Sequence, residues 1–303
     1  MMRRKITLAR LLLIVIVMSG QMLTASKSTS LHKAAKRGDI IKIRSLIEKE
    51  VSLTNRDKEG NTPLHIALIN NHEEAALEII NALKEAQNNK TSKKKNLLSR
   101  FFKSKEDHTS LDKNNKGQKE LTLAVMNNLN DAVKEIIDLA KQDASVDFTK
   151  YMNESDSALH LPIFQAIRVN NLWALEYLLS QGANVPPEAL FWINWNDYSS
   201  SDIAKTLLNY GINPNTNTNL DRHTALHRAV IAENQKAIKL LLEAGARIDI
   251  KDNRNKTAMD YAYRDDIKDL LINWNSKDQE RSAMNSKQEE LSPQEDYSDD
   301  ENS

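Results

Sequence analysis

Histidine is the side chain in this sequence best suited to bind a metal or to move protons near neutral pH. The seven histidines stand at positions 32, 65, 72, 108, 160, 223 and 227. His223 and His227 are four residues apart, a spacing that places two side chains on one face of a helix. His223, however, precedes the expected helix cap Thr224, and neither a third ligand nor a glutamate at HExxH spacing accompanies the pair. We therefore expect no metal site.

Other patterns that commonly support catalysis are missing from the sequence. The chain has no cysteine, which excludes thiolate catalysis, disulfides and cysteine-based zinc sites. It has no glycine-rich phosphate loop, no Gly-x-Ser-x-Gly motif and no paired carboxylates in a predicted cleft. We expect a protein that is not an enzyme and needs no cofactor.

His65 belongs instead to a motif that recurs along the chain. The stretch Asn61–Ala67, NTPLHIA, returns as Thr224–Ala229, TALHRA, and more loosely as Thr257–Ala262, TAMDYA. Leu31 lies 33 residues before Leu64, the same interval that separates Thr224 from Thr257. Looser copies begin near residues 117, 161 and 186. The sequence therefore predicts about seven structural repeats.

Each copy contains the signals of a helix start followed by a second helix. Thr62 and Thr224 are expected N-caps, and Pro63 suits the first turn, where its missing N–H costs nothing. Apolar residues at i, i+3 and i+4 then predict a second helix, which Gly245 ends in the last complete copy. Because His65 recurs as His32 and His227 at a packing position, we expect it to be structural and hydrogen-bonded.

The copy Thr224–Asp249, TALHRAVIAENQKAIKLLLEAGARID, resembles an ankyrin repeat in its Thr-x-Leu-His opening, its Leu-Leu-Leu and its Glu-Ala-Gly-Ala. The resemblance covers residues 26–274. It implies an all-α solenoid of about seven helix-turn-helix units joined by β-hairpin-like loops. It also implies that the protein binds other proteins.

Charge composition and the N-terminal segment narrow the possible partners and locations but do not identify a function. Lysine plus arginine and aspartate plus glutamate number 42 each, so total charge favours neither nucleic acid nor an acidic partner. Residues 1–25 combine Arg3, Arg4 and Lys5 with the apolar run Leu11–Met18, which is typical of a signal peptide. An uncleaved membrane anchor and a buried core helix are the alternatives. We expect an exported protein, periplasmic or secreted.

Two segments depart from the repeat pattern. A basic insertion at about residues 85–112 carries Lys93, Lys94 and Lys95 next to Phe101 and Phe102. It is interpreted as a flexible surface loop, with weak contact to anionic membranes as the alternative. Residues 275–303 hold nine acidic and three basic residues and few apolar ones, so we expect a disordered acidic tail.

Aromatic residues are concentrated in one part of the chain. Trp173, Tyr177, Trp192 and Trp195 fall within 23 residues although aromatic residues make up only 5% of the sequence. Since Trp and Tyr contribute strongly to interfaces, they predict a binding patch on the concave face. The alternative is that large side chains fill space in an irregular repeat.

The sequence thus predicts a scaffold, most simply a monomer, that binds a protein through its concave face and hairpin tips. A host-directed effector is the first hypothesis for its role. A periplasmic module that binds an endogenous enzyme and a peripheral membrane protein are the alternatives. The tip residues expected to contact the partner are Arg56, Asp57, Lys58, Glu59, Asn217, Asn219, Asp221, Arg222, Asp252, Asn253 and Arg254.

Overall fold

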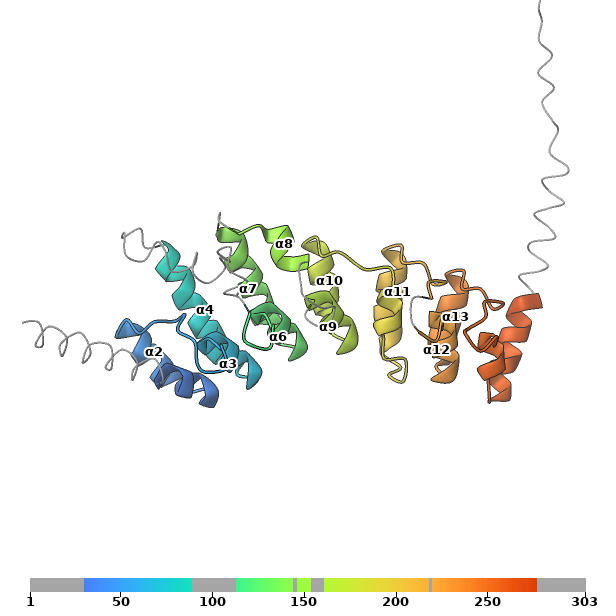
Figure 1. The fold of residues 1–303 in the computed structure, drawn as a ribbon, viewed down its shortest axis with the longest axis horizontal. Coiled ribbons are helices and arrows are strands. Elements are labelled where there is room, and N and C mark those ends of the chain that lie inside the picture. Colours follow the sequence, from blue (N-terminus) through green and yellow to red (C-terminus); the bar gives the residue numbers. More distant parts are fainter. Residues whose placement is uncertain (1–29, 89–112, 144–145, 154–160, 218–219, 277–303) are drawn as a thin grey trace, which may run out of the picture. The chain divides into compact units, whose positions relative to one another are not determined.

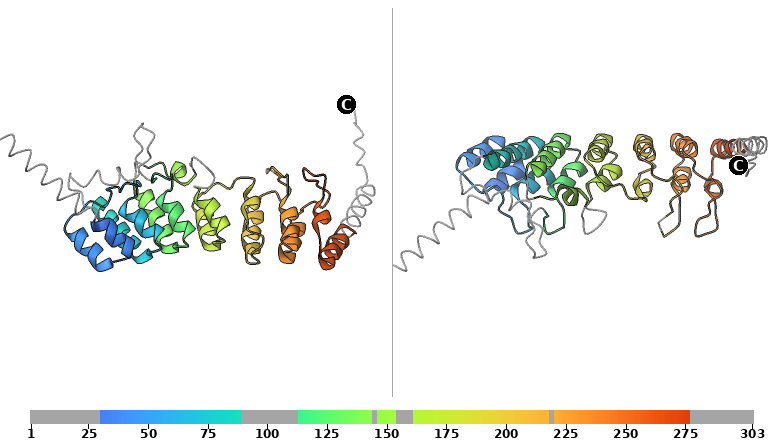
Figure 2. Two further views of the ribbon diagram at one scale, coloured as in Figure 1. Left: turned by 60° about the horizontal axis from the view of Figure 1, so that its bottom comes forward. Right: turned by 90° about the horizontal axis from the view of Figure 1, so that it is seen from above.

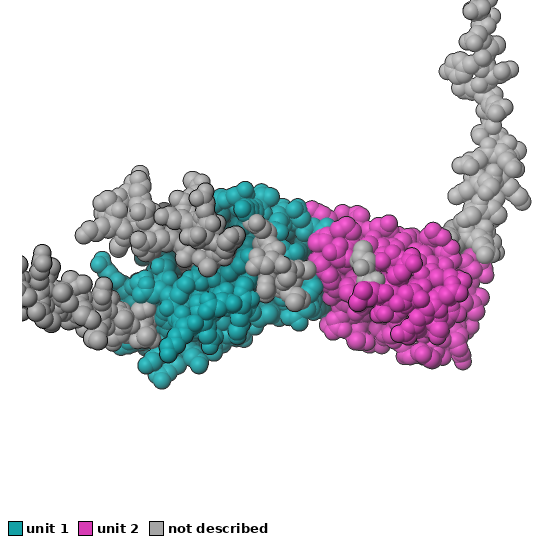
Figure 3. All heavy atoms as spheres, in the orientation of Figure 1, with its two compact units in different colours: residues 1–185 teal, residues 186–303 magenta. Residues whose placement is uncertain are grey.

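The computed structural model describes residues 30–88, 113–143, 146–153, 161–217 and 220–276. Within these residues the chain contains helices and turns but no strand, and the helices follow one another in antiparallel pairs (Figure 1). The chain divides into two compact units, residues 1–185 (unit 1) and residues 186–303 (unit 2) (Figure 3). Each unit contains its own set of helix pairs.

Unit 1 holds four described helix pairs arranged in two layers. The first helices of the last three pairs are α3, α6 and α9, and α6 packs against both α3 and α9. The second helices pack in the order α2, α4, α7 and α10. The pairs are 30–37 with α2 (Ile40–Glu48), α3 (Pro63–Ile69) with α4 (Glu73–Asn88), α6 (Glu120–Met126) with α7 (Asn130–Gln142), and α9 (Pro162–Arg168) with α10 (Leu172–Ser180).

Unit 2 holds three described pairs. Two of them open with a short 3-10 helix, η2 or η3, in place of an α-helix. The hairpin loops of the unit project to one side of the pairs (Figure 2). The pairs are η2 (Ala189–Trp192) with α11 (Ser200–Asn209), α12 (Ala225–Ile231) with α13 (Gln235–Glu243), and η3 (Ala258–Tyr261) with residues 265–276.

The core is built from the recurring small and branched residues of the motif. Leu64 and Leu226 are 0% exposed, and so are Ala67 and Ala229 one turn further along the same helices. The small alanines and the larger leucines of the motif are thus both part of a densely packed core. No single pair buries its own apolar face, so the pairs depend on stacking for stability.

The turn between the two helices of each pair requires one residue with a left-handed backbone conformation, that is, with positive φ. Asn71, Asn128 and Asn170 occupy it with φ of 59°, 58° and 57°, as the side chain of asparagine tolerates. Gly38 occupies it with φ of 65°, and a Cβ there would lie 2.9 Å from the ring of His72. Glu233, with φ of 53°, fills the same place in unit 2 without any sequence signal for it.

Several details differ from the sequence predictions. Helix α8 (Phe148–Asn153) was not expected between α7 and α9. Helix α4 runs through Asn88, four residues into the segment predicted as the basic insertion. The hairpin loops form by turns, and among the described residues only Lys113 and Lys119 make an isolated β-bridge. In the same part of the chain, no helix combines the length and apolar character needed to cross a bilayer.

Candidate partner-binding surface

The hairpin tips are held by the same device in both units. Asp57, Asn114 and Asp252 each accept hydrogen bonds through Oδ1 from the backbone N–H groups two and four residues ahead, at 2.8 to 3.0 Å. Each also closes the turn by donating its own N–H to the carbonyl four residues ahead. A side chain that mimics a backbone turn in this way orders the loop locally.

In unit 1, adjacent tips are joined to one another. Arg56 Nη1 donates to the carbonyls of Gly60 and Lys113 at 2.7 and 2.6 Å. The Asn115 N–H donates to the Glu59 carbonyl at 3.0 Å. Lys58 and Glu59 are exposed. Arg56 and Asp57 therefore hold the loops in place, and the exposed side chains of this tip are Lys58 and Glu59.

In unit 2, Asp252 departs from its predicted role as an exposed contact. The residue is 5% exposed, and its side chain accepts hydrogen bonds from His223 and Tyr261 as well as from the backbone. Burial raises the pKa of the Asp252 carboxyl, but the hydrogen bonds from Tyr261, from the Lys256 and Arg254 N–H groups and from His223 outweigh burial and hold this pKa well below its usual range. Asp252 is a support of the tip.

The other predicted tip residues of unit 2 are at or near the surface. Asp221, Arg222 and Arg254 are exposed. Asn253 is exposed too, and it links the tips by donating to the Leu220 and Asp221 carbonyls at 3.1 and 3.0 Å. Asn217 is half-buried, and Asn219 lies outside the described residues.

The predicted aromatic patch is divided between the two units. In unit 1, Trp173 and Tyr177 stack with ring centroids 5.0 Å apart on α10, and Trp173 is 41% exposed. Helix α10 belongs to the second-helix layer, so this pair does not lie on the face of first helices and hairpin tips where it was expected. In unit 2, Trp192 is half-buried and Trp195 is 2% exposed, so Trp195 packs inside the unit.

The recurring histidines connect one helix pair to the next. His65 and His227 complete capping boxes with Thr62 and Thr224, in which each threonine Oγ1 accepts from the histidine N–H. The ring atom Nε2 of each histidine donates a hydrogen bond to a backbone carbonyl of the following repeat. The acceptor is the Gln118 carbonyl for His65, at 3.1 Å, and the Lys256 carbonyl for His227, at 3.2 Å. The spacing of the motif indicated the cap, but it carried no signal for the bond between repeats.

The i, i+4 pair His223 and His227 forms a ring stack. The centroids are 5.3 Å apart and the rings are inclined by 2°. His223 Nε2 lies 3.2 Å from Asp252 Oδ2. Over the described ranges, no cluster of three or more His, Cys, Asp or Glu side chains has the geometry to hold a metal ion. The pair is part of the packing beneath the last tip.

The buried histidine predicts a pH dependence for unit 2. Burial lowers the pKa of His227, and the neighbouring His223 acts in the same direction, against the opposing effects of the Lys256 carbonyl, Asp252 and Asp260. The unfolded chain then binds a proton at higher pH than the folded chain. Stability should therefore fall as pH drops below about 6.5, the ordinary histidine value. Chemical unfolding at several pH values between 7.5 and 5 should show this decrease in the free energy of unfolding. The decrease should be smaller in His227→Gln, and an equal decrease in the variant would contradict the assignment of the pH dependence to His227.

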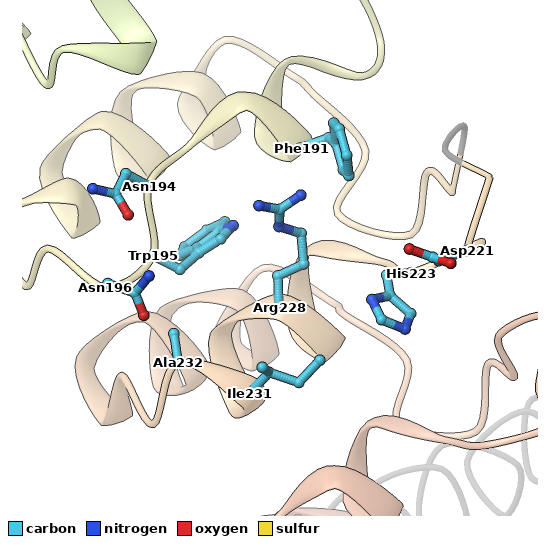
Figure 4. Close-up of a pocket in the computed structure, with 9 residues that line it drawn as sticks. All are labelled: Phe191, Asn194, Trp195, Asn196, Asp221, His223, Arg228, Ile231 and Ala232. Atoms are coloured by element: carbon cyan, nitrogen blue, oxygen red, sulfur yellow. The ribbon is translucent and has the colours of Figure 1, made fainter.

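Unit 2 also contains a cleft that sequence reasoning did not find (Figure 4). It has a volume of ≈ 240 Å³ and lies between the η2 segment, helix α12 and the preceding hairpin. Arg228 and Asp221 are charged residues of its lining, and Arg228 Cζ lies 4.3 Å from the centroid of the Phe191 ring. Burial lowers the pKa of Arg228. Arg228 stands inside the recurring motif, at a position that gave no functional signal in the sequence.

The basic insertion and the two ends of the chain contribute nothing to this description. Lys93, Lys94, Lys95, Phe101 and Phe102 lie outside the described residues, as do residues 1–25 and 277–303. The predictions for a membrane-contacting loop, a leader and an acidic tail therefore stay predictions.

Comparison with known proteins places the repeats in a family. The family model "Ankyrin repeats (3 copies)" matches residues 3–92 and 191–281, together more than half of the chain. Palmitoyltransferase ZDHHC17 is similar over a short stretch. The protein of Homo sapiens is 37% identical over 73 residues, which are 24% of this chain and 11% of that protein. The protein of Rattus norvegicus is 36% identical over 73 residues, which are 24% of this chain and 12% of that protein.

The fold is also similar to that of a solved domain. The human ASB11 ankyrin repeat domain superposes with a TM-score of 0.56 and 19% identity, covering 80% of this chain and 96% of that domain. An ankyrin repeat domain from Acinetobacter baumannii gives a TM-score of 0.49 and 21% identity, covering 72% and 98%. The family match and the human domain confirm the predicted all-α repeat fold. The chain belongs to the ankyrin-repeat family.

Proposed function

We propose that this protein is a non-enzymatic scaffold that binds another protein through its hairpin tips and the face formed by the first helices of the pairs. The observation that supports it best is the shared construction of the tips. Asp57, Asn114 and Asp252 hold three loops in one conformation while the charged side chains between the bonded positions remain exposed. Loops ordered before binding lose little conformational entropy when a partner docks.

The contacts available on these tips are mixed in charge. Lys58 and Glu59 stand on a tip of unit 1, and Asp221, Arg222 and Arg254 stand on the tips of unit 2. Exposed charges of both signs at fixed positions favour recognition of a complementary protein surface. Membership of the ankyrin-repeat family supports a protein partner as well.

Site-specific photo-crosslinking of the full chain tests this proposal. A photoreactive residue is placed at Arg222 or at Arg254, and for comparison at Lys239 on α13 or Lys134 on α7, which are also exposed but belong to the second-helix layer. We expect discrete crosslinked proteins from the tip positions and not from the controls. Equal products from all four positions would contradict binding through the tips.

We further propose that the protein is exported and acts outside the cell that makes it, with a host protein as partner. The basic and apolar segments of residues 1–25 support export, although the family match begins inside this segment. Sequencing the N-terminus of the protein recovered from its producing cells should give a start near residue 26. An intact Met1 would contradict cleavage. Crosslinking in lysates of both the producing cell and eukaryotic cells then separates a host partner from an endogenous one.

A further inference from the structure

The cleft in unit 2 combines a charged group with an apolar wall. Phe191, Ile231 and Ala232 provide apolar surface, and the exposed side chains of Asn194 and Asn196 stand at its edge (Figure 4). These residues come from two consecutive repeats, so stacking of the repeats creates the cleft. A cavity of ≈ 240 Å³ is large enough for one amino-acid side chain and too small for a drug-sized ligand.

Arg228 offers hydrogen-bond donors that the described protein does not use. Its guanidinium stacks on the Phe191 ring, and among the described residues no side-chain or backbone oxygen accepts a hydrogen bond from it. Stacking on an aromatic face holds the planar group in one orientation and leaves its edge free. A guanidinium edge fixed in this way matches the two oxygens of a carboxylate.

Trp195 supplies a second donor without an acceptor. The residue is 2% exposed, and its Nε1–H has no hydrogen-bond partner among the described residues. The nitrogen-bearing edge of the indole is turned toward the Arg228 guanidinium (Figure 4). Both groups can only donate, so neither satisfies the other. A buried donor left unpaired is costly, and two that converge call for an acceptor between them.

From this arrangement we propose that the cleft receives the side-chain carboxylate of a glutamate or aspartate in the partner protein. The apolar wall covers the methylene groups of that side chain, and the amides of Asn194 and Asn196 bond to the peptide on either side. Asp221 at the rim disfavours a second negative charge, so a monoanionic carboxylate fits better than a phosphate dianion. The inference rests on the proposed function, because it names the chemistry that one part of the partner carries.

The test follows the indole and guanidinium N–H signals of the ¹⁵N-labelled full chain by NMR during peptide titration. Acetyl-Ala-Glu-Ala-amide should shift the Trp195 indole signal and the Arg228 Nε–H signal. Acetyl-Ala-Gln-Ala-amide should bind at least about tenfold more weakly, because it lacks the charge-assisted pair. The Trp173 indole in unit 1 serves as an internal control and should not move.

Two variants separate the cleft from general charge attraction. Arg228→Lys keeps the charge but loses the planar fork, and should weaken binding of the glutamate peptide several-fold. Lys239→Gln removes an exposed positive charge on α13 that does not line the cleft, and should leave binding unchanged. Thermal unfolding of both variants checks that they are folded.

Three results would overturn the proposal. They are equal responses to the glutamate and glutamine peptides, equal loss of binding in Lys239→Gln and Arg228→Lys, and a stronger response to inorganic phosphate or to acetyl-Ala-Gln-Ala with a free C-terminal carboxylate. The titration needs no partner, so its failure leaves binding through the hairpin tips intact. Failure of the crosslinking with a normal peptide response would instead contradict the scaffold function alone.

Discussion

Replacing His65 by alanine should lower the free energy of unfolding by about 3 to 5 kcal/mol, the usual cost of removing one partner from a buried ionisable pair. His65 and Glu120 are both 0% exposed, and His65 Nδ1 lies 2.9 Å from Glu120 Oε1. This contact joins the first helices of two consecutive pairs, α3 and α6. Alanine at position 65 removes this contact and the bond from Nε2 to the Gln118 carbonyl.

Glu120 makes the experiment specific to the pair. It stands where the motif has Pro63 in the preceding repeat and Ala225 in unit 2, so alanine is compatible with this position of the fold. After His65→Ala, the Glu120 carboxyl is left buried without a partner. The double variant His65→Ala, Glu120→Ala should therefore cost less than the sum of the single changes, with a coupling of about 1 to 3 kcal/mol.

Urea unfolding followed by circular dichroism measures these differences, and hydrogen exchange in α3 and α6 locates them. A repeat protein can open one part at a time, so exchange at the two helices is the more direct measurement. Additive costs in the double variant would show that the His65–Glu120 contact contributes no energy of its own.

Leu64→Ala should cost about 2 to 5 kcal/mol of the free energy of unfolding, because it removes a fully buried side chain from the core and leaves a cavity. Leu64 is 0% exposed at the start of α3. Ile69 at the end of the same helix is 43% exposed, so Ile69→Ala is the matched control and should change stability by no more than about 0.5 kcal/mol. The two changes remove comparable apolar volume from one helix.

Equilibrium unfolding of the full chain by urea compares the two variants. The stability difference between them reports burial between repeats, since helix propensity changes in a similar direction in both. Equal effects at positions 64 and 69 would mean that α3 contributes little to the packing of unit 1.

The family and the repeat plan could be predicted from local sequence. A repeat is a local object of about 33 residues, and its signals lie within it: Thr62 as cap, Pro63 in the first turn, Leu64 and Ala67 on the buried face. The positive φ of Asn71 follows from the same logic, because a tight turn between two helices needs a residue that tolerates it. Such features depend on neighbours in sequence, and periodicity exposes them.

The roles of individual side chains depended on contacts between repeats, which sequence spacing does not encode. Asp252 lies in a segment whose sequence is typical of an exposed turn. Its carboxylate nevertheless accepts hydrogen bonds from His223 and Tyr261 in the folded protein. Trp195 belongs to an aromatic cluster in sequence, yet it lies inside unit 2 next to Arg228. The linear chain therefore identified the family and the periodic core, since both are local. Stacking alone brought the donors of the cleft together, because Trp195 and Arg228 are 33 residues apart and meet only when one repeat packs on the next.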